Sequence, residues 1–330
     1  MRHVLRETGL GLTGIDLSSI GSKLFSWNRS PVLRYCAVHD GVGGVYQAAI
    51  APSVALLKPT VAPPLIHRAA AQHWLRTHFS DKRVLLFPVG ACRSRHGIWE
   101  SMPVGIEDRC RGNPAYEAHL RARLVRRLGP LNVSKTSSLP PGAASFFRQW
   151  LRRHPLPAMQ GQLAWSALDI PRERVCVALH HRSELHGFAV AARMWDTHAG
   201  SYELEALVHN RGVSPVLGAW LVQRLAVELS QPLALGLSPL TGPVPAWLRW
   251  GGHLGEPLYP FASLASFKEK QAAANERRVR FLVYPAVAGP GANACAIRDL
   301  LCVFAGGSIS RFALRSLVRR LALSREPATT

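Results

Sequence analysis

The second half of the chain alternates short apolar runs with amphipathic segments, and this alternation constrains the fold more than any other feature. Residues 215–229 fit an amphipathic helix in which leucine recurs every four positions. Apolar runs of strand length lie at residues 175–179, 187–192, 201–208, 233–237 and 281–284. The order strand, strand, strand, helix, strand, helix, strand predicts an α/β protein, a mixed sheet with helices on both faces.

The first half reads as mixed strand and helix. We expect short strands at residues 34–38 and 44–50, a helix at 67–78, a buried strand at 83–89 and a helix at 114–128. These five segments are long enough in total for a domain of their own.

Two connecting segments divide the chain further. Residues 134–144 are rich in Ser, Pro and Gly and predict a linker, followed by a short basic helix at 144–154. Residues 180–186 read as a polar loop between two paired strands. We therefore expect two domains, at residues 1–143 and 144–330.

The chain carries 40 Lys and Arg against 20 Asp and Glu, a formal net charge of +20. Residues 161–250 are balanced, so the basic excess lies in the flanks. Such an imbalance indicates polyanionic partners, either nucleic acid or anionic lipid, although a generally arginine-rich protein would show it too.

Three predicted basic helices, at residues 115–128, 146–154 and 310–323, each join an apolar stripe to several arginines. They suit contacts with RNA phosphates or docking on an anionic membrane, and solvated surface helices are the alternative. The candidate anion-binding residues are Arg121, Arg123, Arg126, Arg127, Arg315 and Arg319.

Cysteine and histidine usage argues against a metal centre. The six cysteines form no C-x-x-C pair, and the fourteen histidines include no H-E-x-x-H motif. No run of eighteen apolar residues exists, and the first residues lack the apolar core of a signal peptide. We therefore expect a cytoplasmic protein with no metal, no disulfide framework and no spanning helix.

Three motifs follow one another within about fifty residues. They are Leu235-Gly236-Leu237-Ser238-Pro239-Leu240-Thr241-Gly242, Phe267-Lys268-Glu269-Lys270 and Arg280-Phe281-Leu282-Val283-Tyr284-Pro285. This order resembles the cytosolic catalytic domain of the phosphatidylglycerol lysyltransferase family over about residues 174–285. The resemblance implies tandem GNAT-like (acetyltransferase-type) domains that move an amino acid from aminoacyl-tRNA, the co-substrate, to a lipid head group without any cofactor.

The strand at residues 201–208 carries two carboxylates. Alternation places Tyr202, Leu204 and Ala206 on one face and Glu203 and Glu205 on the other. Two solvated glutamates are the alternative to a site. In the resembled family this strand carries an Asp-Leu-Met-Arg motif; Glu205 falls at its Asp and Val208 at its Arg, which leaves the acceptor open.

Lys268 and Lys270 lie two positions apart, so on a helix they diverge by about 200° and only one can face a pocket. The resemblance implies that Glu205, Lys268 and Lys270 are catalytic. The candidate substrate-binding residues are Glu203, Arg211, Ser238, Glu276 and Arg280. Residues 210–215 lack the Gln/Arg-x-x-Gly-x-Gly/Ala loop that cradles coenzyme A, which disfavours an acetyl-CoA enzyme.

Together these features predict an aminoacyl-tRNA-dependent aminoacyltransferase. Phosphatidylglycerol is the acceptor that the resemblance implies, with the protein cytoplasmic or peripheral at the inner face of the membrane. One alternative keeps the chemistry but uses a soluble amine or hydroxylamine acceptor. Another is a non-catalytic RNA- or membrane-binding GNAT-like module.

Overall fold

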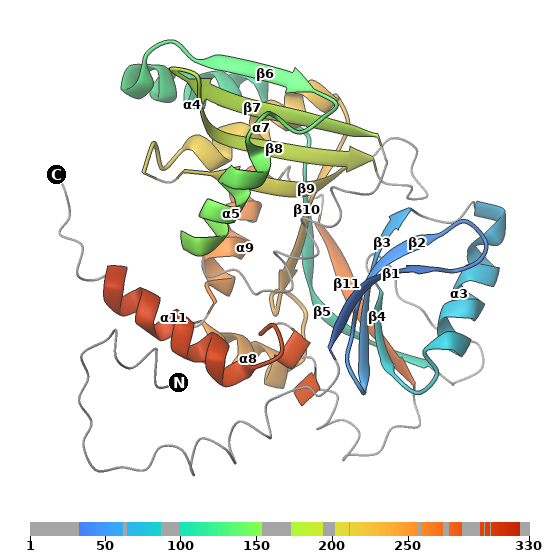
Figure 1. Cartoon of the computed structure of the whole chain (residues 1–330). Coiled ribbons are helices and arrows are strands. Elements are labelled where there is room, and N and C mark those ends of the chain that lie inside the picture. Colours follow the sequence, from blue (N-terminus) through green and yellow to red (C-terminus); the bar gives the residue numbers. More distant parts are fainter. Residues whose placement is uncertain are drawn as a thin grey trace, which may run out of the picture.

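The computed structural model describes residues 33–61, 65–86, 99–153, 173–193, 202–210, 212–256, 259–272, 277–285, 298–299, 301–303 and 305–323. Their strands form one eleven-stranded sheet in the order β1-β2-β3-β4-β11-β5-β10-β9-β8-β7-β6 (Figure 1). Only the β3–β4 and β9–β10 pairs of the described sheet are parallel. The predicted mixed α/β sheet is confirmed.

The N-terminal end of the sheet is a three-stranded meander followed by a helix and a fourth strand. Its elements are β1 (Arg34–His39), β2 (Val45–Ile50), β3 (Val54–Val61), η1 (Leu65–His67), α3 (Arg68–His78) and β4 (Arg83–Leu86). Leu57 of β3 packs with Leu75 of α3 in a buried cluster, which holds the helix on the sheet. The strands and helix predicted here are confirmed, within a residue or two at their ends.

A long strand, β5 (Trp99–Cys110), runs through the middle of the sheet between β10 and β11. It leads into α4 (Pro114–Leu128), whose start is fixed by Asn113. The Asn113 side-chain oxygen accepts a hydrogen bond from the Tyr116 amide at 3.0 Å, and Pro114 follows in the first turn, where its missing N–H costs nothing.

The C-terminal part adds the remaining strands and helices around β5. They are β6 (Asn132–Thr136), α5 (Ala143–Arg153), β7 (Arg174–His181), β8 (Glu184–Arg193), β9 (Tyr202–His209), α7 (Leu217–Leu229), β10 (Leu233–Pro239), α8 (Ala246–Gly255), α9 (Phe261–Gln271), β11 (Arg277–Pro285) and α11 (Ile309–Leu323). From β7 to β11 the predicted GNAT-like order is present, with α8 as an additional helix.

Two predicted loops are shorter than expected. Residues 134–136 of the expected linker are the end of β6, which pairs with β7. The expected polar loop at 180–186 is a tight hairpin, because Arg182 and Ser183 both adopt positive φ angles, 49° and 68°. Two successive left-handed residues match the twist of paired strands, so the strands continue to the turn itself.

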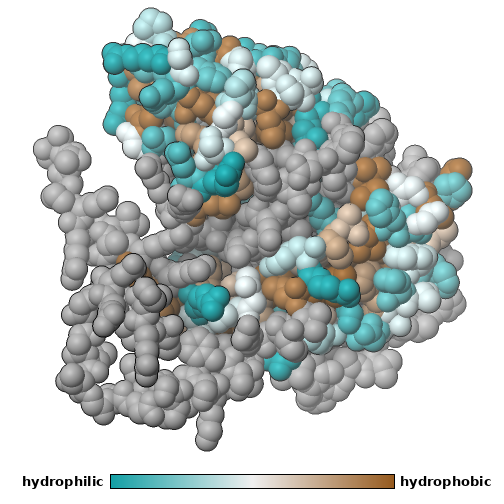
Figure 2. Space-filling model, viewed as in Figure 1, coloured by the Kyte–Doolittle hydropathy of each residue, from teal (hydrophilic) through white to brown (hydrophobic). Residues whose placement is uncertain are grey.

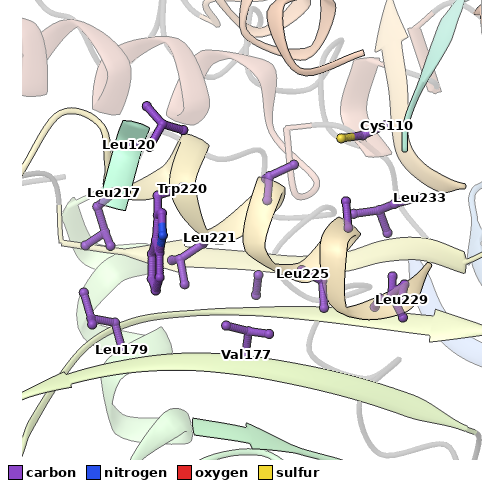
Figure 3. Packing of buried hydrophobic residues seen from close by; sticks show 14 of the residues in the cluster. Cys110, Leu120, Val177, Leu179, Leu217, Trp220, Leu221, Leu225, Leu229 and Leu233 are labelled. Atoms are coloured by element: carbon purple, nitrogen blue, oxygen red, sulfur yellow. The ribbon is translucent and has the colours of Figure 1, made fainter. Parts of the chain in front are cut away.

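Helices cover both faces of the C-terminal part of the sheet, as predicted. On one face α7 contributes Trp220, Leu221 and Leu225 to the largest buried cluster, which also contains Leu120 and Leu124 of α4 (Figure 3). On the other face α5 packs Phe147 against Phe188 of β8. We call these the α7 face and the α5 face.

The α7-face cluster joins residues from both sides of the expected boundary at 143/144, since α4 lies before it and α7 after it. The division into two domains stays a prediction. On the side seen in Figure 2, hydrophobic and hydrophilic residues of the described part are interspersed over both ends of the sheet.

Candidate active site

The parallel strands β9 and β10 pair only at their beginnings. Leu233 lies opposite Tyr202 and Ala234 opposite Glu203, and the ladder between the two strands then ends. Beyond this point β9 continues along β8 to His209, whereas β10 continues along β5 to Pro239. The carboxyl ends of two parallel strands therefore separate, an arrangement in which α/β sheets commonly bind ligands.

A bulge in β9 sets the direction of the Glu205 side chain. Val190 pairs with Ala206 and Ala191 pairs with Leu204, so Glu205 is the extra residue. Ala206 consequently packs in the α5-face cluster, whereas Leu204 packs on the α7 face. The alternation expected for Tyr202, Leu204 and Ala206 is therefore wrong at Ala206, because a bulge shifts every later residue by one position.

Glu205 is paired with an arginine two strands away. Its side chain is fully buried, and its Oε2 accepts a hydrogen bond from Nε of Arg174 at 2.8 Å. Arg174 alternates with Cys176 and Ala178 of the α5-face cluster, which puts the pair on that face. The burial of a carboxylate is tolerable here because the guanidinium compensates its charge.

The pair belongs to a row of charged and small residues that crosses five strands on the α5 face. The register places Arg109 of β5 opposite Ala234, Ala234 opposite Glu203, Glu203 opposite Ala192, and Ala192 opposite Arg174. The two alanines leave room for the long side chains beside them. We call Arg109, Glu203 and Arg174, with their neighbours Glu107 and Glu205, the charged row.

The β5 members of the charged row were not predicted. Glu107 and Arg109 are 6% and 4% exposed, and Nε of Arg109 lies 3.7 Å from Oε1 of Glu107. The one signal in the sequence was the charged triplet at residues 107–109, directly before Cys110. Charged residues in a strand ordinarily indicate an exposed edge, so this triplet pointed away from its true position in the centre of the sheet.

Lys268 approaches the same junction from the opposite face. Its ammonium donates hydrogen bonds to the carbonyl oxygens of Gly236, at 3.0 Å, and Leu237, at 2.7 Å. These carbonyls lie at an irregularity of β10, where Gly236 has a φ of +76° that favours glycine. Since Phe267 packs in the α7-face cluster, Lys268 and Glu205 reach the strands from different sides.

The other lysine points away from this site. Lys270 is exposed, whereas Lys268 is 8% exposed, as the helical spacing of the two residues requires. Arg277 of β11 anchors α9 nearby, donating to Asp108 Oδ1 at 2.9 Å and lying 2.7 Å from Glu269 Oε1. The hydrogen bond to Glu269, together with the charge of Asp108, raises the pKa of Arg277 above its ordinary value.

Ser238 carries an unsatisfied hydroxyl at the carboxyl end of β10. The residue is 1% exposed, and its Oγ has no hydrogen-bond partner among the described residues. Its backbone carbonyl accepts from the Thr241 hydroxyl at 2.7 Å, which closes the turn after the strand. A buried hydroxyl without a partner costs free energy, and a ligand that supplies an acceptor would recover it.

The remaining candidates are distributed over the surface or fall outside the description. Four α4 arginines are exposed, namely Arg121, Arg123, Arg126 and Arg127. Arg211 and Glu276 lie outside the described residues, as do the side chains of Arg280, Arg315 and Arg319. Among the described residues, no group of three His, Cys, Asp or Glu could hold a metal ion. None of the helices in this part has the length and apolar character needed to cross a membrane.

No protein-family model and no curated protein sequence matches the chain. Two solved structures share its fold. One is L-PGS, lysylphosphatidylglycerol synthetase, from Bacillus licheniformis, with 15% identity, a TM-score of 0.50, and 81% of this chain matching 88% of that one. The other is the C-terminal domain of a protein from Agrobacterium fabrum assigned as a lysylphosphatidylglycerol synthetase, with 14% identity, a TM-score of 0.55, and coverage of 83% and 90%.

Identity at this level establishes the fold. The resemblance to the phosphatidylglycerol lysyltransferase catalytic domain is thus confirmed in three dimensions, over more of the chain than the motifs covered.

Proposed function

We propose that this protein is an aminoacyltransferase that moves an amino acid from aminoacyl-tRNA to an acceptor hydroxyl or amine. The observation that supports this most is the separation of β9 and β10 between the charged row and Lys268, within a fold shared with L-PGS. The site combines buried carboxylates, a held ammonium and an unsatisfied hydroxyl.

The proposed reaction needs little covalent chemistry from the protein. The acceptor oxygen or nitrogen forms a bond to the ester carbonyl carbon, the bond to the 3′-terminal ribose oxygen breaks, and the proton of the acceptor passes to that leaving oxygen. Because the ester is already activated, the protein mainly positions the two substrates and stabilises the oxyanion.

The residues divide between these tasks by their surroundings. Glu203 and Glu205 supply negative charge on the α5 face, suited to the ammonium group of the aminoacyl moiety. The Ser238 hydroxyl supplies a hydrogen-bond donor for the ester oxygen. Lys268 holds the irregular part of β10 in place through two carbonyls, and its charge adds positive potential beside Ser238.

The acceptor is the open part of the proposal. Phosphatidylglycerol is the acceptor of choice because the two proteins that share the fold are named as lysylphosphatidylglycerol synthetases. One observation favours a soluble amine or hydroxylamine instead. Val208 falls where the resembled family has an arginine, and it is 1% exposed within the α5-face cluster, so no cation at this position binds a lipid phosphate.

The test supplies tRNA charged with radiolabelled amino acids to the full chain. Phosphatidylglycerol in detergent is the acceptor in one arm, a soluble amine or hydroxylamine in a second, and no acceptor in a third. Label appearing in lipid supports the main proposal, and label appearing in the amine supports the second. If charged tRNA binds without any transfer, the non-catalytic module replaces both.

A further inference from the structure

The C-terminal helix α11 exposes an apolar stripe to solvent. Leu314, Leu317 and Val318 are 49%, 56% and 45% exposed. On a helix they occupy one arc of about 100°. The side that packs on the rest of the protein is a different one, formed by half-buried Phe312 and Ala313 and by Ser316, which is 5% exposed. Figure 1 shows α11, in red, at the periphery of the molecule.

The same helix is basic. Its sequence holds four arginines and no acidic residue, and Arg311 at its beginning is exposed. A helix that combines a solvent-facing aliphatic stripe with positive charge has the character of an interfacial helix, which buries its apolar side among acyl chains and holds its cations at the lipid phosphates.

We propose that α11 docks the protein on an anionic phospholipid surface. Charge complementarity selects this occupant over the others. An RNA partner would take the arginines but leave the three aliphatic side chains in water. A second copy related by two-fold symmetry would bring the arginines of one α11 toward those of the other, and like charges repel. An anionic lipid surface satisfies both the apolar stripe and the arginines.

Docking of this kind deepens the proposed function, on which the choice of phosphatidylglycerol rests, because it would bring the site to a lipid acceptor. The test sediments the full chain with vesicles of phosphatidylcholine alone or of phosphatidylcholine and phosphatidylglycerol in equal parts. We expect binding to the mixed vesicles that weakens with added salt, and little binding to phosphatidylcholine.

The variant Leu314→Asn/Leu317→Asn/Val318→Asn should lower the affinity for mixed vesicles by at least about tenfold. Ile66→Asn is the matched control, since Ile66 is 85% exposed on η1, and it should bind as the unaltered protein does. If the triple variant fails to fold, Leu317→Asn, at the most exposed of the three positions, takes its place with a smaller expected loss.

Three results would overturn the inference. They are an unaltered protein that ignores mixed vesicles, a triple variant that binds them undiminished, and a dimer in light scattering that the triple variant abolishes. Transfer to detergent-dispersed phosphatidylglycerol separates the two proposals. Transfer without vesicle binding would reject α11 docking and keep the proposed function, whereas vesicle binding without transfer to any acceptor would do the reverse.

Discussion

Glu205 on β9 and Arg174 on β7 form a buried ion pair across the intervening strand β8, with 2.8 Å between Oε2 and Nε. The bulge at Glu205 and the small residue Ala192 between the partners make this contact possible. The carboxylate is therefore held in one position by a cation, which suits a group that binds or orients a substrate ammonium.

Glu205→Gln keeps the shape of the side chain and removes its charge. We expect turnover to fall by roughly 10²-fold or more, because the substrate amine loses its counter-charge or its proton acceptor. Steady-state transfer from charged tRNA measures this. Glu184→Gln, at the exposed β7–β8 turn, is the control and should leave turnover unchanged. Thermal unfolding of both variants shows whether the loss is one of chemistry. A well-folded Glu205→Gln protein of normal activity would remove Glu205 from the site.

Lys268→Met and Lys270→Met should differ sharply. Loss of the Lys268 ammonium leaves the Gly236 and Leu237 carbonyls without that donor, so we expect a destabilisation of about 1–3 kcal/mol and reduced turnover. Lys270 is exposed, and its replacement should change stability by less than about 0.5 kcal/mol. Urea unfolding gives the two values, and equal effects would contradict the packing of α9 described above.

The sequence predicted the fold where apolar periodicity is local. β7, β8, β9, α7 and β10 all carry an apolar face that can be read without knowing their neighbours, and all were found. β5 was missed because it becomes a buried central strand only through partners distant in sequence. Its Asp108, for example, is compensated by Arg277 of β11.

The site was predictable only in part, for the same reason. Glu205 and Lys268 were identified through motifs, but the bulge at Glu205 and the partner Arg174 depend on strand register, which no local pattern encodes. The stripe of α11 illustrates the opposite error. Its leucines have the spacing of a buried helix face, yet Leu314 and Leu317 are exposed, since the helix packs through Phe312 and Ser316 instead.

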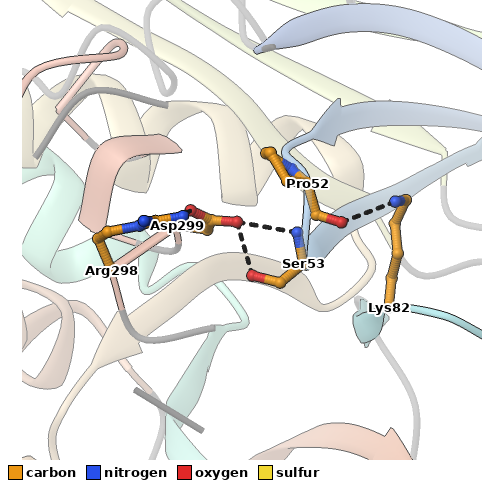
Figure 4. Close-up of polar contacts among 5 residues, drawn as sticks. All are labelled: Pro52, Ser53, Lys82, Arg298 and Asp299. Carbon is orange, nitrogen blue, oxygen red and sulfur yellow. Dashed lines mark hydrogen bonds and ion pairs between the residues drawn. The ribbon is translucent and has the colours of Figure 1, made fainter. Parts of the chain in front are cut away.

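Asp299 should make stability depend on pH. Burial by itself raises the pKa of this carboxyl, but hydrogen bonds from the Ser53 hydroxyl at 2.6 Å and amide at 2.8 Å, together with Arg298, outweigh burial and hold the pKa below its usual range (Figure 4). A lowered folded-state pKa stabilises the protein above the unfolded-state pKa of about 3.9. This stabilisation disappears as the pH falls through the folded-state value.

The variant Asp299→Asn should accordingly be less stable than the unaltered protein at neutral pH, and the difference should shrink below about pH 4. Urea unfolding at a series of pH values measures it. Asp81→Asn is the control, because Asp81 is exposed beside Lys82. A stability difference that stays constant from neutral to acidic pH would mean that the charge of Asp299 contributes nothing.

The last prediction concerns tRNA, the proposed co-substrate. Arg121, Arg123 and Arg126 are exposed on α4, and each arginine that contacts a phosphate releases condensed counterions on binding. Arg123→Gln should therefore weaken tRNA binding and reduce the slope of log affinity against log salt by about 1. Arg148→Gln removes an equal charge from an exposed position on α5, the other face of the sheet, and should leave the slope unchanged if α4 is the contact surface. Equal reductions for both variants would mean that tRNA responds to the overall charge of the protein, and affinity that does not vary with salt at all would contradict phosphate binding by α4.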